Sequence, residues 1–425
     1  MARKMKDSGI EWIGEIPEGW EVSQLKYATR WKSEKGCPDA PVLSLYRDFG
    51  VVPKDSRDDN HNVTSLDTSN YKVVDIGDLV INKMKAWQGS MAVSDYRGIV
   101  SPAYHVCSIT SNKVNKRYLH HLLRNPAYLP EYARLSTGMR IGQWDLGFDD
   151  FKNIPFLIPP LDEQAKIADY LDNGCASLDT ILDKTRSSIE EYKKLKQAVI
   201  TQAVTKGVRG EREMKDSGVE WIGEIPKEWE IKRLKSFCTI VDCKNRTPDV
   251  FPDGKYTVVR TTCIKDCSFS YEGSYQTDTT NFKAWTLKGQ PHKGDIFFTR
   301  EAPVGEACLV PNADNLCMGQ RVMFFRPEDN SDARYIMYSI YGPLVREYIA
   351  SKNSGSTVGH LKLGQVACIP IFYCPPLEQK EIADYLDAKC AEIDGLIAKK
   401  EQLVKELESY KKSLIYEVVT GKREV

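Results

Sequence analysis

The sequence lacks any apolar run near the roughly 20 residues that a membrane-spanning helix requires. Basic residues at the start of the chain have no apolar stretch behind them, so we expect no secretory signal and a cytoplasmic location. The formal net charge is zero, because Lys plus Arg and Asp plus Glu both number 59. This balance excludes a protein that coats nucleic acid by bulk charge, but it allows local basic surfaces.

Motifs of common enzyme classes are missing as well. Residues 158–161, Ile-Pro-Pro-Leu, lack the polar first and aromatic last residue of an amino-methyltransferase motif. Gly421-Lys422 has Tyr416 where a phosphate-binding loop needs its first glycine, and no Ser or Thr follows the lysine. Only six histidines exist, and none lies in a metalloprotease motif. We therefore expect no catalysis by this chain alone and no cofactor of its own.

The twelve cysteines are scattered over the chain, several in apolar contexts. Without an export signal, this distribution favours reduced thiols over disulfides. Cys263 and Cys267 form the closest pair, but no second pair or nearby histidines stand at zinc-ligand spacing. We expect no metal site.

What the sequence does contain is a stretch that occurs twice, at residues 159–205 and again at 375–420. In both copies a proline pair precedes acidic residues, and apolar residues then recur mostly every three, four or seven positions, which predicts one long helix each. A helix of roughly 40 residues is about 60 Å long, and its narrow apolar stripe favours pairing with the other copy as a coiled coil. The alternative is two amphipathic helices, each packed only on its own domain. The expected pairing positions are Ile167, Leu171, Leu178, Leu182, Ile189, Ile382, Leu386, Ile393, Ile397 and Val404.

A second repeat makes the whole chain a tandem duplication. Residues 5–26 return almost letter for letter at 214–235, both with the run Trp-Ile-Gly-Glu-Ile-Pro. The period exceeds 200 residues, so each unit should be a domain followed by a helix. The predicted order is a first domain, a first long helix, a second domain and a second long helix, at residues 1–157, 158–207, 208–373 and 374–425.

This order also predicts an arrangement. If the second unit repeats the first, the two long helices run antiparallel and the domains are related by a pseudo-two-fold axis. Residues 5–25 should then dock near Thr420 and Gly421, as residues 214–234 dock at the end of the first helix. The tryptophans of these segments should pack a domain against a helix end or form a docking surface shared by both halves; they are Trp12, Trp20, Trp221 and Trp229.

The two domains share only a skeleton between residues 27–157 and 236–373. Short β-branched and aromatic runs bounded by Gly, Pro, Asn and Asp predict many short strands, with helical patches near 117–123 and 334–349. The fold class is therefore α+β, with two mixed α/β domains. A shared skeleton with different loops in the two domains suggests one scaffold that carries two different specificities.

Candidate nucleic-acid contacts fall in the loops that differ between the halves. One loop type follows a predicted strand at residues 82–90 and at 299–305, and offers side chains for phosphates or base edges. A glycine-rich loop type lies at 136–144 and 354–360, where the backbone can approach a phosphate. The alternative for each is an ordinary hairpin turn. A local basic excess at 113–140 adds phosphate candidates, although a solvated helix face would look similar. The candidates are Lys83, Lys85, Trp87, Gln88, Lys116, Arg117, Thr137, Arg140, Gln143, Arg260, Arg300, Glu301, Arg321, Ser356, Thr357, His360 and Lys362.

Two motifs together carry a family resemblance. They are the repeated Gly-Glu-Ile-Pro-x-x-Trp opening and the Pro-Pro-Leu-x-x-Gln-x-x-Ile-Ala-x-Tyr-Leu-Asp segment, whose second copy is one residue shorter after the prolines. With unlike domains between them, the chain resembles the specificity subunit of a type I restriction-modification system over essentially its whole length.

The resemblance implies two target-recognition domains that each read one half of a split double-stranded DNA site, separated by an antiparallel coiled coil. It also implies two adenine-methylating modification subunits as partners, and a translocating restriction subunit in a larger complex. S-adenosylmethionine would be bound by the modification subunit and not by this chain.

Two other classes stay open at this point. A stand-alone DNA-acting enzyme would bind S-adenosylmethionine as the isolated chain. A scaffold that no longer reads DNA would assemble with a methyltransferase but give no sequence-dependent methylation.

Overall fold

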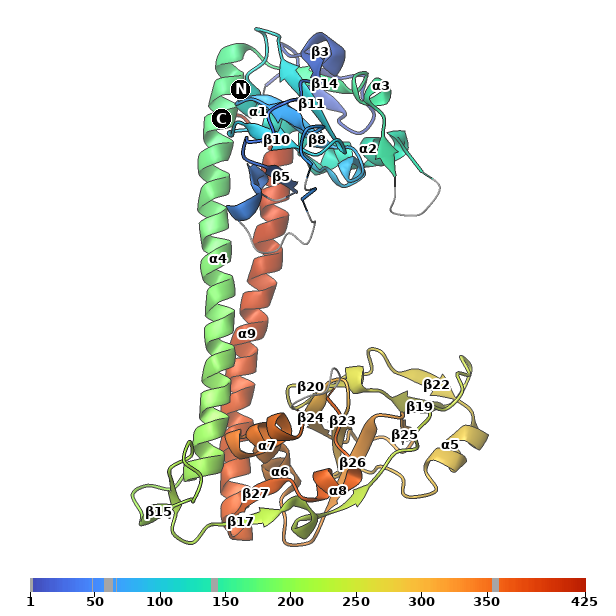
Figure 1. Ribbon diagram of the computed structural model, residues 1–425, viewed down its shortest axis with the longest axis vertical. Coiled ribbons are helices and arrows are strands. Elements are labelled where there is room, and N and C mark those ends of the chain that lie inside the picture. Colours follow the sequence, from blue (N-terminus) through green and yellow to red (C-terminus); the bar gives the residue numbers. More distant parts are fainter. Residues whose placement is uncertain (1–2, 48, 57–63, 66, 139–143, 354–358) are drawn as a thin grey trace. The chain divides into compact units, whose positions relative to one another are not determined.

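The computed structural model describes residues 3–47, 49–56, 64–65, 67–138, 144–353 and 359–425 (Figure 1). Its contacts divide the chain into two compact units: unit 1 is Met1–Arg186 with Gln402–Val425, and unit 2 is Ser187–Glu401. Each unit therefore combines one mixed α/β domain with parts of both long helices. This division crosses the helices, whereas the division predicted from the sequence keeps each helix as a segment of its own.

The two long helices of the repeated stretch are confirmed as α4 (Leu161–Lys206, 46 residues) and α9 (Pro376–Val419, 44 residues). A proline pair precedes or opens each helix, and acidic residues occupy its first turn, where the helix dipole favours them. The chain leaves each helix through a glycine with positive φ, Gly207 after α4 and Gly421 after α9. No helix in the described ranges has the length and apolarity to cross a membrane.

In unit 1 the first part of α4 lies beside the last part of α9 (Figure 1). Asp179 pairs with Lys411 at 2.6 Å, and further along α4 Arg186 pairs with Glu408 at 2.7 Å. The residue number rises on α4 while it falls on α9, so these segments are antiparallel. The predicted pairing residues Ile167, Leu171, Leu178 and Leu182 are buried, and Val404 is half-buried.

In unit 2 the last part of α4 lies beside the first part of α9, again antiparallel. Lys196 pairs with Asp394 at 2.7 Å, and the ammonium of Lys400 lies 5.7 Å from the ring centre of Tyr192. The predicted pairing residues Ile189, Ile382, Leu386 and Ile393 are buried, and Ile397 is half-buried.

Each helix pair also packs on the domain of its own unit. In unit 1, Ile167 and Leu171 of α4 share one apolar core with Leu414 and Val418 of α9 and with the domain. Unit 2 has the same arrangement with α4 and α9 exchanged, since Ile200 and Leu386 join its core. Helix pairing and domain packing, which the sequence presented as alternatives, therefore coexist.

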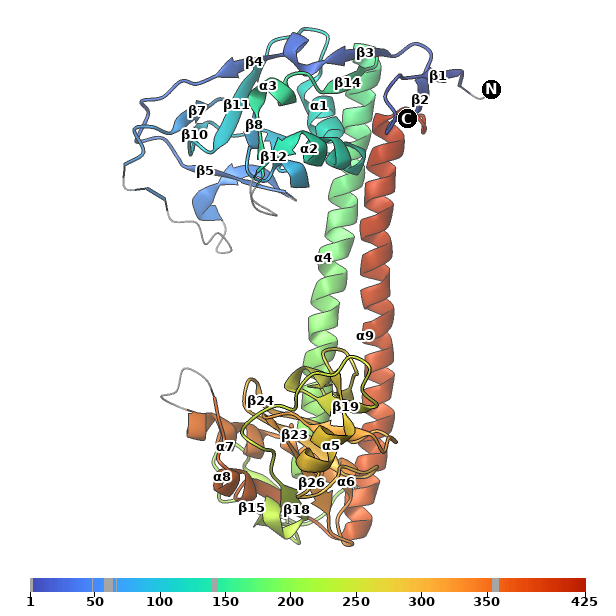
Figure 2. The ribbon, with the colours of Figure 1, turned by 90° about the vertical axis from the view of Figure 1, so that its right-hand side faces the viewer.

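The domain of unit 1 is organised on a four-stranded antiparallel sheet with the order β4-β11-β8-β9. Helices α1 and α2 pack with this sheet and α4 around one core (Figure 2). The sheet strands are β4 (Thr29–Lys32), β8 (Asp78–Asn82), β9 (Met91–Val93) and β11 (Tyr104–Ile109). The other elements are β1 (Met5–Asp7), β2 (Glu15–Pro17), β3 (Glu21–Gln24), β5 (Leu43–Tyr46), β6 (Gly50–Pro53), β7 (Lys72–Val74), β10 (Gly98–Val100), β12 (Ser136–Thr137), β13 (Asp145–Leu146), β14 (Pro155–Ile158), α1 (Lys116–Leu123), α2 (Leu129–Leu135) and α3 (Phe148–Phe151).

Unit 2 repeats this sheet with the order β18-β26-β23-β24. Its strands are β18 (Cys238–Val241), β23 (Ile296–Arg300), β24 (Val304–Leu309) and β26 (Val322–Pro327). The other elements are β15 (Met214–Asp216), β16 (Glu224–Pro226), β17 (Glu230–Arg233), β19 (Tyr256–Val259), β20 (Ile264–Lys265), β21 (Ser268–Phe269), β22 (Tyr275–Thr277), β25 (Leu316–Met318), β27 (Pro370–Tyr373), α5 (Thr279–Trp285), α6 (Ala333–Ile340), α7 (Pro343–Asn353) and α8 (Leu363–Ala367).

The units differ in what is added to the shared sheet. Unit 1 adds two strand pairs, β5-β6 and β7-β10, whereas unit 2 adds a three-stranded sheet of order β22-β19-β25 and the helix α5. The internal repeat and the α+β class predicted from the sequence are confirmed. The single helical patch expected at 334–349 is instead two helices, because Pro343 lacks a backbone N–H and begins a new helix after the turn at Gly342.

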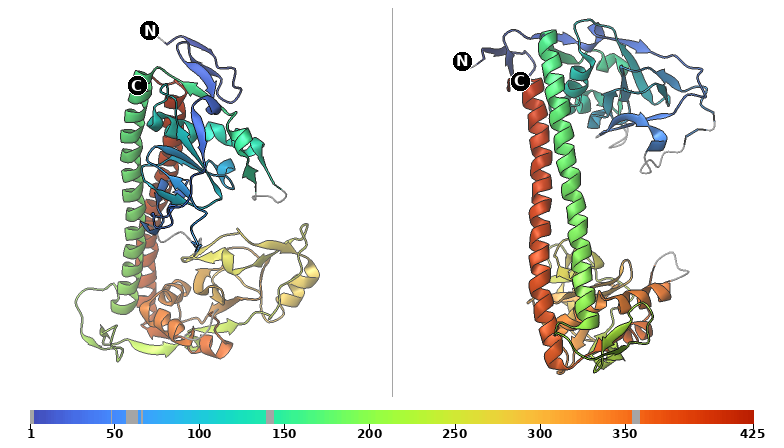
Figure 3. Two further views of the ribbon diagram at one scale, coloured as in Figure 1. Left: turned by 45° about the horizontal axis from the view of Figure 1, so that its top comes forward. Right: turned by 90° about the vertical axis from the view of Figure 1, so that its left-hand side faces the viewer.

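In unit 1 the N-terminal segment docks where α9 ends and α4 begins, as predicted (Figure 3). Lys422 donates to the backbone oxygen of Ile13 at 2.8 Å, beyond the end of α9. The buried indole of Trp20 donates to Glu163 of α4 at 3.0 Å, and Arg3 donates to the same carboxylate at 2.8 Å.

In unit 2 the second copy of the segment docks in the same way. Lys206 at the end of α4 donates to the backbone oxygen of Ile222 at 3.4 Å. Arg212 pairs with Glu378 of α9 at 2.5 Å and lies 5.3 Å from the ring centre of the buried Trp229. Trp221 is 63% exposed, so of the two predicted roles for these tryptophans it fits a place on a docking surface.

Candidate nucleic-acid interface

In unit 1 the structure brings together the two loops that the sequence singled out separately. Lys83, directly after β8, accepts a backbone hydrogen bond from Leu146 at 3.0 Å, and its ammonium lies 3.0 Å from Asp145. The rings of Trp87 and Trp144 meet edge to face, with 5.1 Å between their centres. The loop at 82–90 and the end of the glycine-rich loop are therefore one surface.

Unit 2 joins its two loops by the same contact. Arg300, at the end of β23, accepts a backbone hydrogen bond from Leu361 at 3.0 Å. Next to it, Glu301 and His360 form a backbone bridge, and a carboxylate oxygen of Glu301 lies 3.4 Å from Nδ1 of His360. Arg300 thus takes the place of Lys83, and Leu361 the place of Leu146. The same pair of loops carries different side chains in the two units.

Three of the predicted residues of unit 1 are exposed on this surface: Lys85, Gln88 and Thr137. An exposed amine can neutralise a backbone phosphate, and an amide can pair bidentately with adenine. Lys83 and Trp87 are half-buried, and their contacts to Asp145 and Trp144 hold the two loops together.

Arg300 differs from the expectation that its guanidinium reads a guanine. It is only 8% exposed, and it donates to Asp242 at 3.1 Å and to Asn245 at 2.9 Å. A buried arginine with these partners positions the loop that follows β18. This contact could not be predicted from local sequence patterns, because the partners lie 55 and 58 residues away along the chain.

Glu301 is also engaged within unit 2. Its carboxylate lies 3.3 Å from Arg321 and 3.4 Å from His360, which leaves it less free to accept from a cytosine amine. The remaining predicted residues of this unit offer cationic or polar groups to solvent. Arg260, His360 and Lys362 are exposed, and Arg321 is half-buried.

Four predicted contacts, Arg140, Gln143, Ser356 and Thr357, lie outside the described residues.

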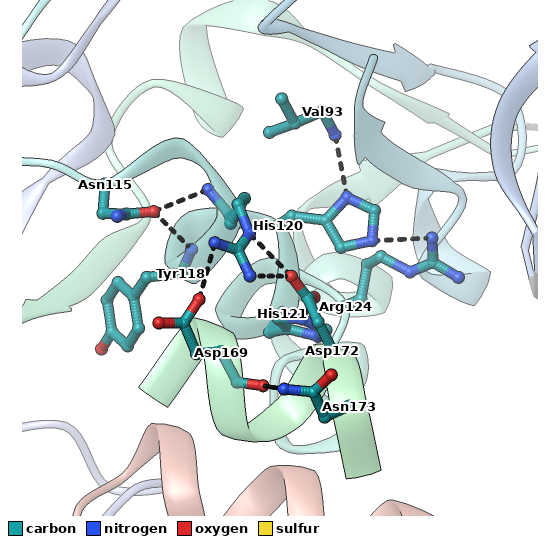
Figure 4. Close-up of polar contacts among 10 residues, drawn as sticks. Val93, Asn115, Tyr118, His120, His121, Arg124, Asp169, Asp172 and Asn173 are labelled. Atoms are coloured by element: carbon teal, nitrogen blue, oxygen red, sulfur yellow. Dashed lines mark hydrogen bonds and ion pairs between the residues drawn. The ribbon is translucent and has the colours of Figure 1, made fainter. Parts of the chain in front are cut away.

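The basic stretch at 113–140 is not a free cationic surface. The Arg117 guanidinium binds Asp169 at 2.8 Å and also Asp172, both on α4 (Figure 4). His121 adds a 2.6 Å contact to Asp172. The hydrogen bond with His121, helped by Arg117, lowers the pKa of Asp172 to about 2. Arg117 therefore fastens α1 to α4 and is withdrawn from the DNA candidates.

The matching contact in unit 2 supports this structural role. Arg334 of α6 binds Asp384 at 2.7 Å and Asp387 at 2.8 Å on α9, and Tyr338 donates to Asp387 at 2.9 Å. The hydrogen bond with Asp332, together with those to these two carboxylates, raises the pKa of the Arg334 guanidinium. A contact present in both units cannot encode two specificities.

Other bases of the stretch have partners as well. Arg134 binds Glu131 at 2.7 Å, and the exposed Lys113 lies 3.6 Å from Glu21. Lys116, a predicted contact, is exposed and lies over Gly77. Exposed ion pairs contribute roughly 0–1 kcal/mol each, so they neutralise charge more than they stabilise the fold.

One basic loop was missed from the sequence. Lys244, Asn245 and Arg246 follow β18 and reach the loop after β23 through the contact between Asn245 and Arg300. Lys244 and Arg246 lie 4.7 and 5.3 Å from the ring centre of Trp285. The Lys-Asn-Arg run, two residues after the β-branched stretch at 239–241, is the signal that could have found it.

The paired sheets and paired loops define a duplicated α/β recognition protein, and comparison with known proteins gives its class. Residues 17–191 and 226–406 both match the type I restriction modification DNA specificity domain. The chain belongs to this family, as a specificity subunit of a type I restriction-modification system, with the domain present twice.

The relatives agree over nearly the whole length. The chain is 24% identical to the putative type I restriction enzyme MjaX specificity subunit of Methanocaldococcus jannaschii, over 96% of this chain and 95% of the relative. It is 26% identical to the MjaVIII specificity subunit of the same organism, over 96% and 93%.

Two solved structures share the fold. One comes from a study of complex assembly and conformational transition of the type I R-M system, with a TM-score of 0.69, 16% identity and coverage of 96% and 99%. The other is the HsdS subunit of Thermoanaerobacter tengcongensis, with a TM-score of 0.51, 15% identity and coverage of 96% and 98%.

Proposed function

We propose that this chain reads a bipartite, asymmetric site in double-stranded DNA, one half through each unit. One observation carries the proposal: the same two loops, joined by the same backbone hydrogen bond on the same sheet, bear different side chains in the two units. A shared scaffold gives both units the same way of approaching a duplex. Different side chains at its surface give them different bases to read.

The proposed contacts in unit 1 are Lys85 to phosphate and Gln88 and Thr137 to base edges or backbone. Those in unit 2 are Arg321, His360 and Lys362, with Arg260 nearby and the newly found Lys244, Asn245 and Arg246. The support is exposure and chemistry: these groups are not enclosed in the core, and amines, guanidinium groups and amides are the usual donors to phosphates and purines.

The same proposal assigns partners and chemistry. The chain acts as a non-catalytic recognition subunit that holds two adenine methyltransferase subunits, with a restriction subunit in a larger complex. S-adenosylmethionine binds the methyltransferase subunit and not this chain, and the complex works in the cytoplasm. Membership of the specificity family supports this division of labour.

The test is a map of N6-methyladenine in DNA from cells that express this chain with its methyltransferase partner. We expect methylation at one two-part motif whose halves differ. Gln88→Ala should relax the sequence requirement at positions of one half only, by about 1–3 kcal/mol of discrimination. Lys85→Ala should weaken methylation of all sites alike, because a phosphate contact carries no sequence information.

Lys184→Ala is the matched control, since it removes an exposed lysine from α4 and should leave the motif and its methylation unchanged. Methylation without any motif would identify a scaffold that does not read DNA. A symmetric motif would contradict the assignment of one half to each unit.

A further inference from the structure

An open pocket of about 440 Å³ lies on the N-terminal segment of unit 1. Its apolar wall is formed by Ile10, Trp12, Val22 and Pro155, and Glu11 stands at its side. Val22 is 40% exposed, although it is an apolar residue in the middle of β3. The pocket belongs to none of the loops that differ between the units.

The wall of the pocket is held by a network of short-range hydrogen bonds. Asp7 accepts from the Gly9 N–H at 2.9 Å, Ser8 Oγ accepts from the Ile10 N–H at 3.1 Å, and the Ile10 backbone oxygen accepts from Gly14 at 2.9 Å. Strand β3 pairs with β14, which brings Pro155 to the same surface. The surface is therefore preformed.

Unit 2 builds the same surface from the second copy of the segment. Asp216 accepts from Gly218 at 2.9 Å, and Ser217 Oγ accepts from Val219 at 3.1 Å. Strand β17 pairs with β27 as β3 pairs with β14, so Ile231 takes the place of Val22 and Pro370 that of Pro155. Ile231 is also 40% exposed.

Both copies keep apolar side chains in solvent where folding does not require them. A strand residue whose side chain is 40% exposed contributes little to a core, and a polar residue would serve there equally well. The recognition loops diverge between the units, but this surface does not. It therefore serves something that is the same at both units.

Charge indicates what that partner looks like. Three exposed glutamates of the repeated segment recur at the same positions, Glu11, Glu15 and Glu21 in unit 1 and Glu220, Glu224 and Glu230 in unit 2, and Glu11 itself lines the pocket. Carboxylates repel the phosphates of DNA, so the surface does not extend the nucleic-acid interface. They favour a protein segment that carries Lys or Arg beside an apolar side chain.

We propose that the Val22 surface and the Ile231 surface are two corresponding docking sites for two copies of one protein subunit. Each copy inserts an apolar side chain against Trp12, Val22 and Pro155, or against Ile231 and Pro370, and places basic residues on the recurring glutamates. That this subunit is the methyltransferase rests on the function proposed above. That both surfaces bind the same subunit does not, because it rests on the repetition of the surface in the two units.

The copies are not identical, which predicts unequal strength. Trp12 is half-buried and lies edge to face with Tyr128, with 6.5 Å between ring centres, whereas Trp221 is 63% exposed. The unit 2 site offers more free aromatic surface. Trp221→Ala should therefore weaken binding at its own site and leave the unit 1 site unchanged.

The test places a charge in each surface. Val22→Glu and Ile231→Glu are made singly and together in the full chain, and binding of the purified methyltransferase subunit is followed by native mass spectrometry and titration. We expect the original chain to bind two methyltransferase subunits. Each single variant should lose at least about tenfold in affinity for one of them, and the double variant for both, because a charged side chain at the centre of a contact must be desolvated.

Matched controls separate docking from folding. Ile76→Glu in unit 1 and Leu287→Glu in unit 2 charge other exposed apolar residues, 68% and 84% exposed, and should bind two subunits as before. Circular dichroism and thermal unfolding check that every variant is folded.

The outcomes distinguish this inference from the proposed function. If the double variant binds two subunits with unchanged affinity, the docking sites are wrong while the proposed function stands. If the original chain binds no methyltransferase subunit, the proposed function fails first. A changed methylation motif in either variant, or self-association of the original chain that the variants abolish, would also overturn the inference, because the occupant would then be DNA or a second copy.

Discussion

At the scale of residues, the duplication shows which side chains serve the scaffold. Arg117 near the start of α1 and Arg334 near the start of α6 each bind two aspartates of a long helix. The residue four positions after this arginine differs between the units. His121 contacts Asp172 in unit 1, whereas Tyr338 donates to Asp387 in unit 2. The aspartate is thus bonded by an imidazole in one unit and by a phenol in the other.

His120 makes unit 1 sensitive to acid. Its ring lies between the Val93 N–H and the Arg124 guanidinium, and burial, with help from Arg124, lowers its pKa from 6.5 to about 3 (Figure 4). An unfolded chain takes up the proton near pH 6.5, but the folded chain does so only near pH 3. The stability that neutral His120 supplies is therefore complete above pH 6.5 and is lost as the pH falls toward 3.

We expect the unfolding free energy of unit 1 to fall by at most about 1.4 kcal/mol per pH unit between pH 6.5 and 5 through this group. His120→Gln removes the titration and should flatten that part of the decline. Hydrogen exchange of unit 1 at pH 7, 6 and 5 measures the difference. His292→Gln, which removes an exposed histidine, is the control and should follow the original chain. An equally steep decline in His120→Gln would assign the effect to other groups.

At the scale of elements, the sequence predicted the long helices well because the signal is local and repeated. A proline pair, acids in the first turn and an apolar stripe of helical period all agree over more than 40 residues, and the structure confirms α4 and α9. The helical patch expected near 334–349 is helical, but Gly342-Pro343 divides it into α6 and α7, and the apolar pattern did not reveal this local break.

The candidate site was predictable as loops but not as an arrangement. Lys85 and Gln88 are exposed as expected, because a polar loop after a strand usually faces solvent. The burial of Arg300 was not predictable, since it depends on Asp242 and Asn245, far away in the sequence. The ion pairs of Arg117 could not be predicted for the same reason, because its two aspartate partners lie on α4, far away in the sequence.

The domain elements should be exchangeable. We expect that replacing residues 27–157 by the corresponding domain of another specificity subunit changes one half of the methylated motif and leaves the other half unchanged. The physical reason is that each unit has its own apolar core, and that the loops of unit 1 contact one another. The measurement is the N6-methyladenine map. Changes in both halves would show that the units do not read DNA independently.

At the scale of the whole molecule, one chain contains two units with the same internal plan. The end of α9 holds the first N-terminal segment through Lys422 and Ile13, and the end of α4 holds the second through Lys206 and Ile222. In each unit, the end of one long helix therefore holds one copy of the repeated N-terminal segment. Residues 161–186 of α4 belong to unit 1 and residues 187–206 belong to unit 2. We expect the length of this helix to set the unread gap in the proposed site.

This role of the helices can be tested by shortening both together. Removing residues 187–190 from α4 and 402–405 from α9 keeps their antiparallel pairing and shortens each helix by about 6 Å, at about 1.5 Å per residue. At about 3.4 Å per base pair along a strand, the unread gap of the motif should shrink by about one or two base pairs. Both halves of the motif should stay the same, because neither deletion touches the recognition loops. Ser187→Ala with Ser188→Ala keeps the length and should keep the gap. If the methylation map instead showed new half-site bases with the original gap, the helices would not set the spacing.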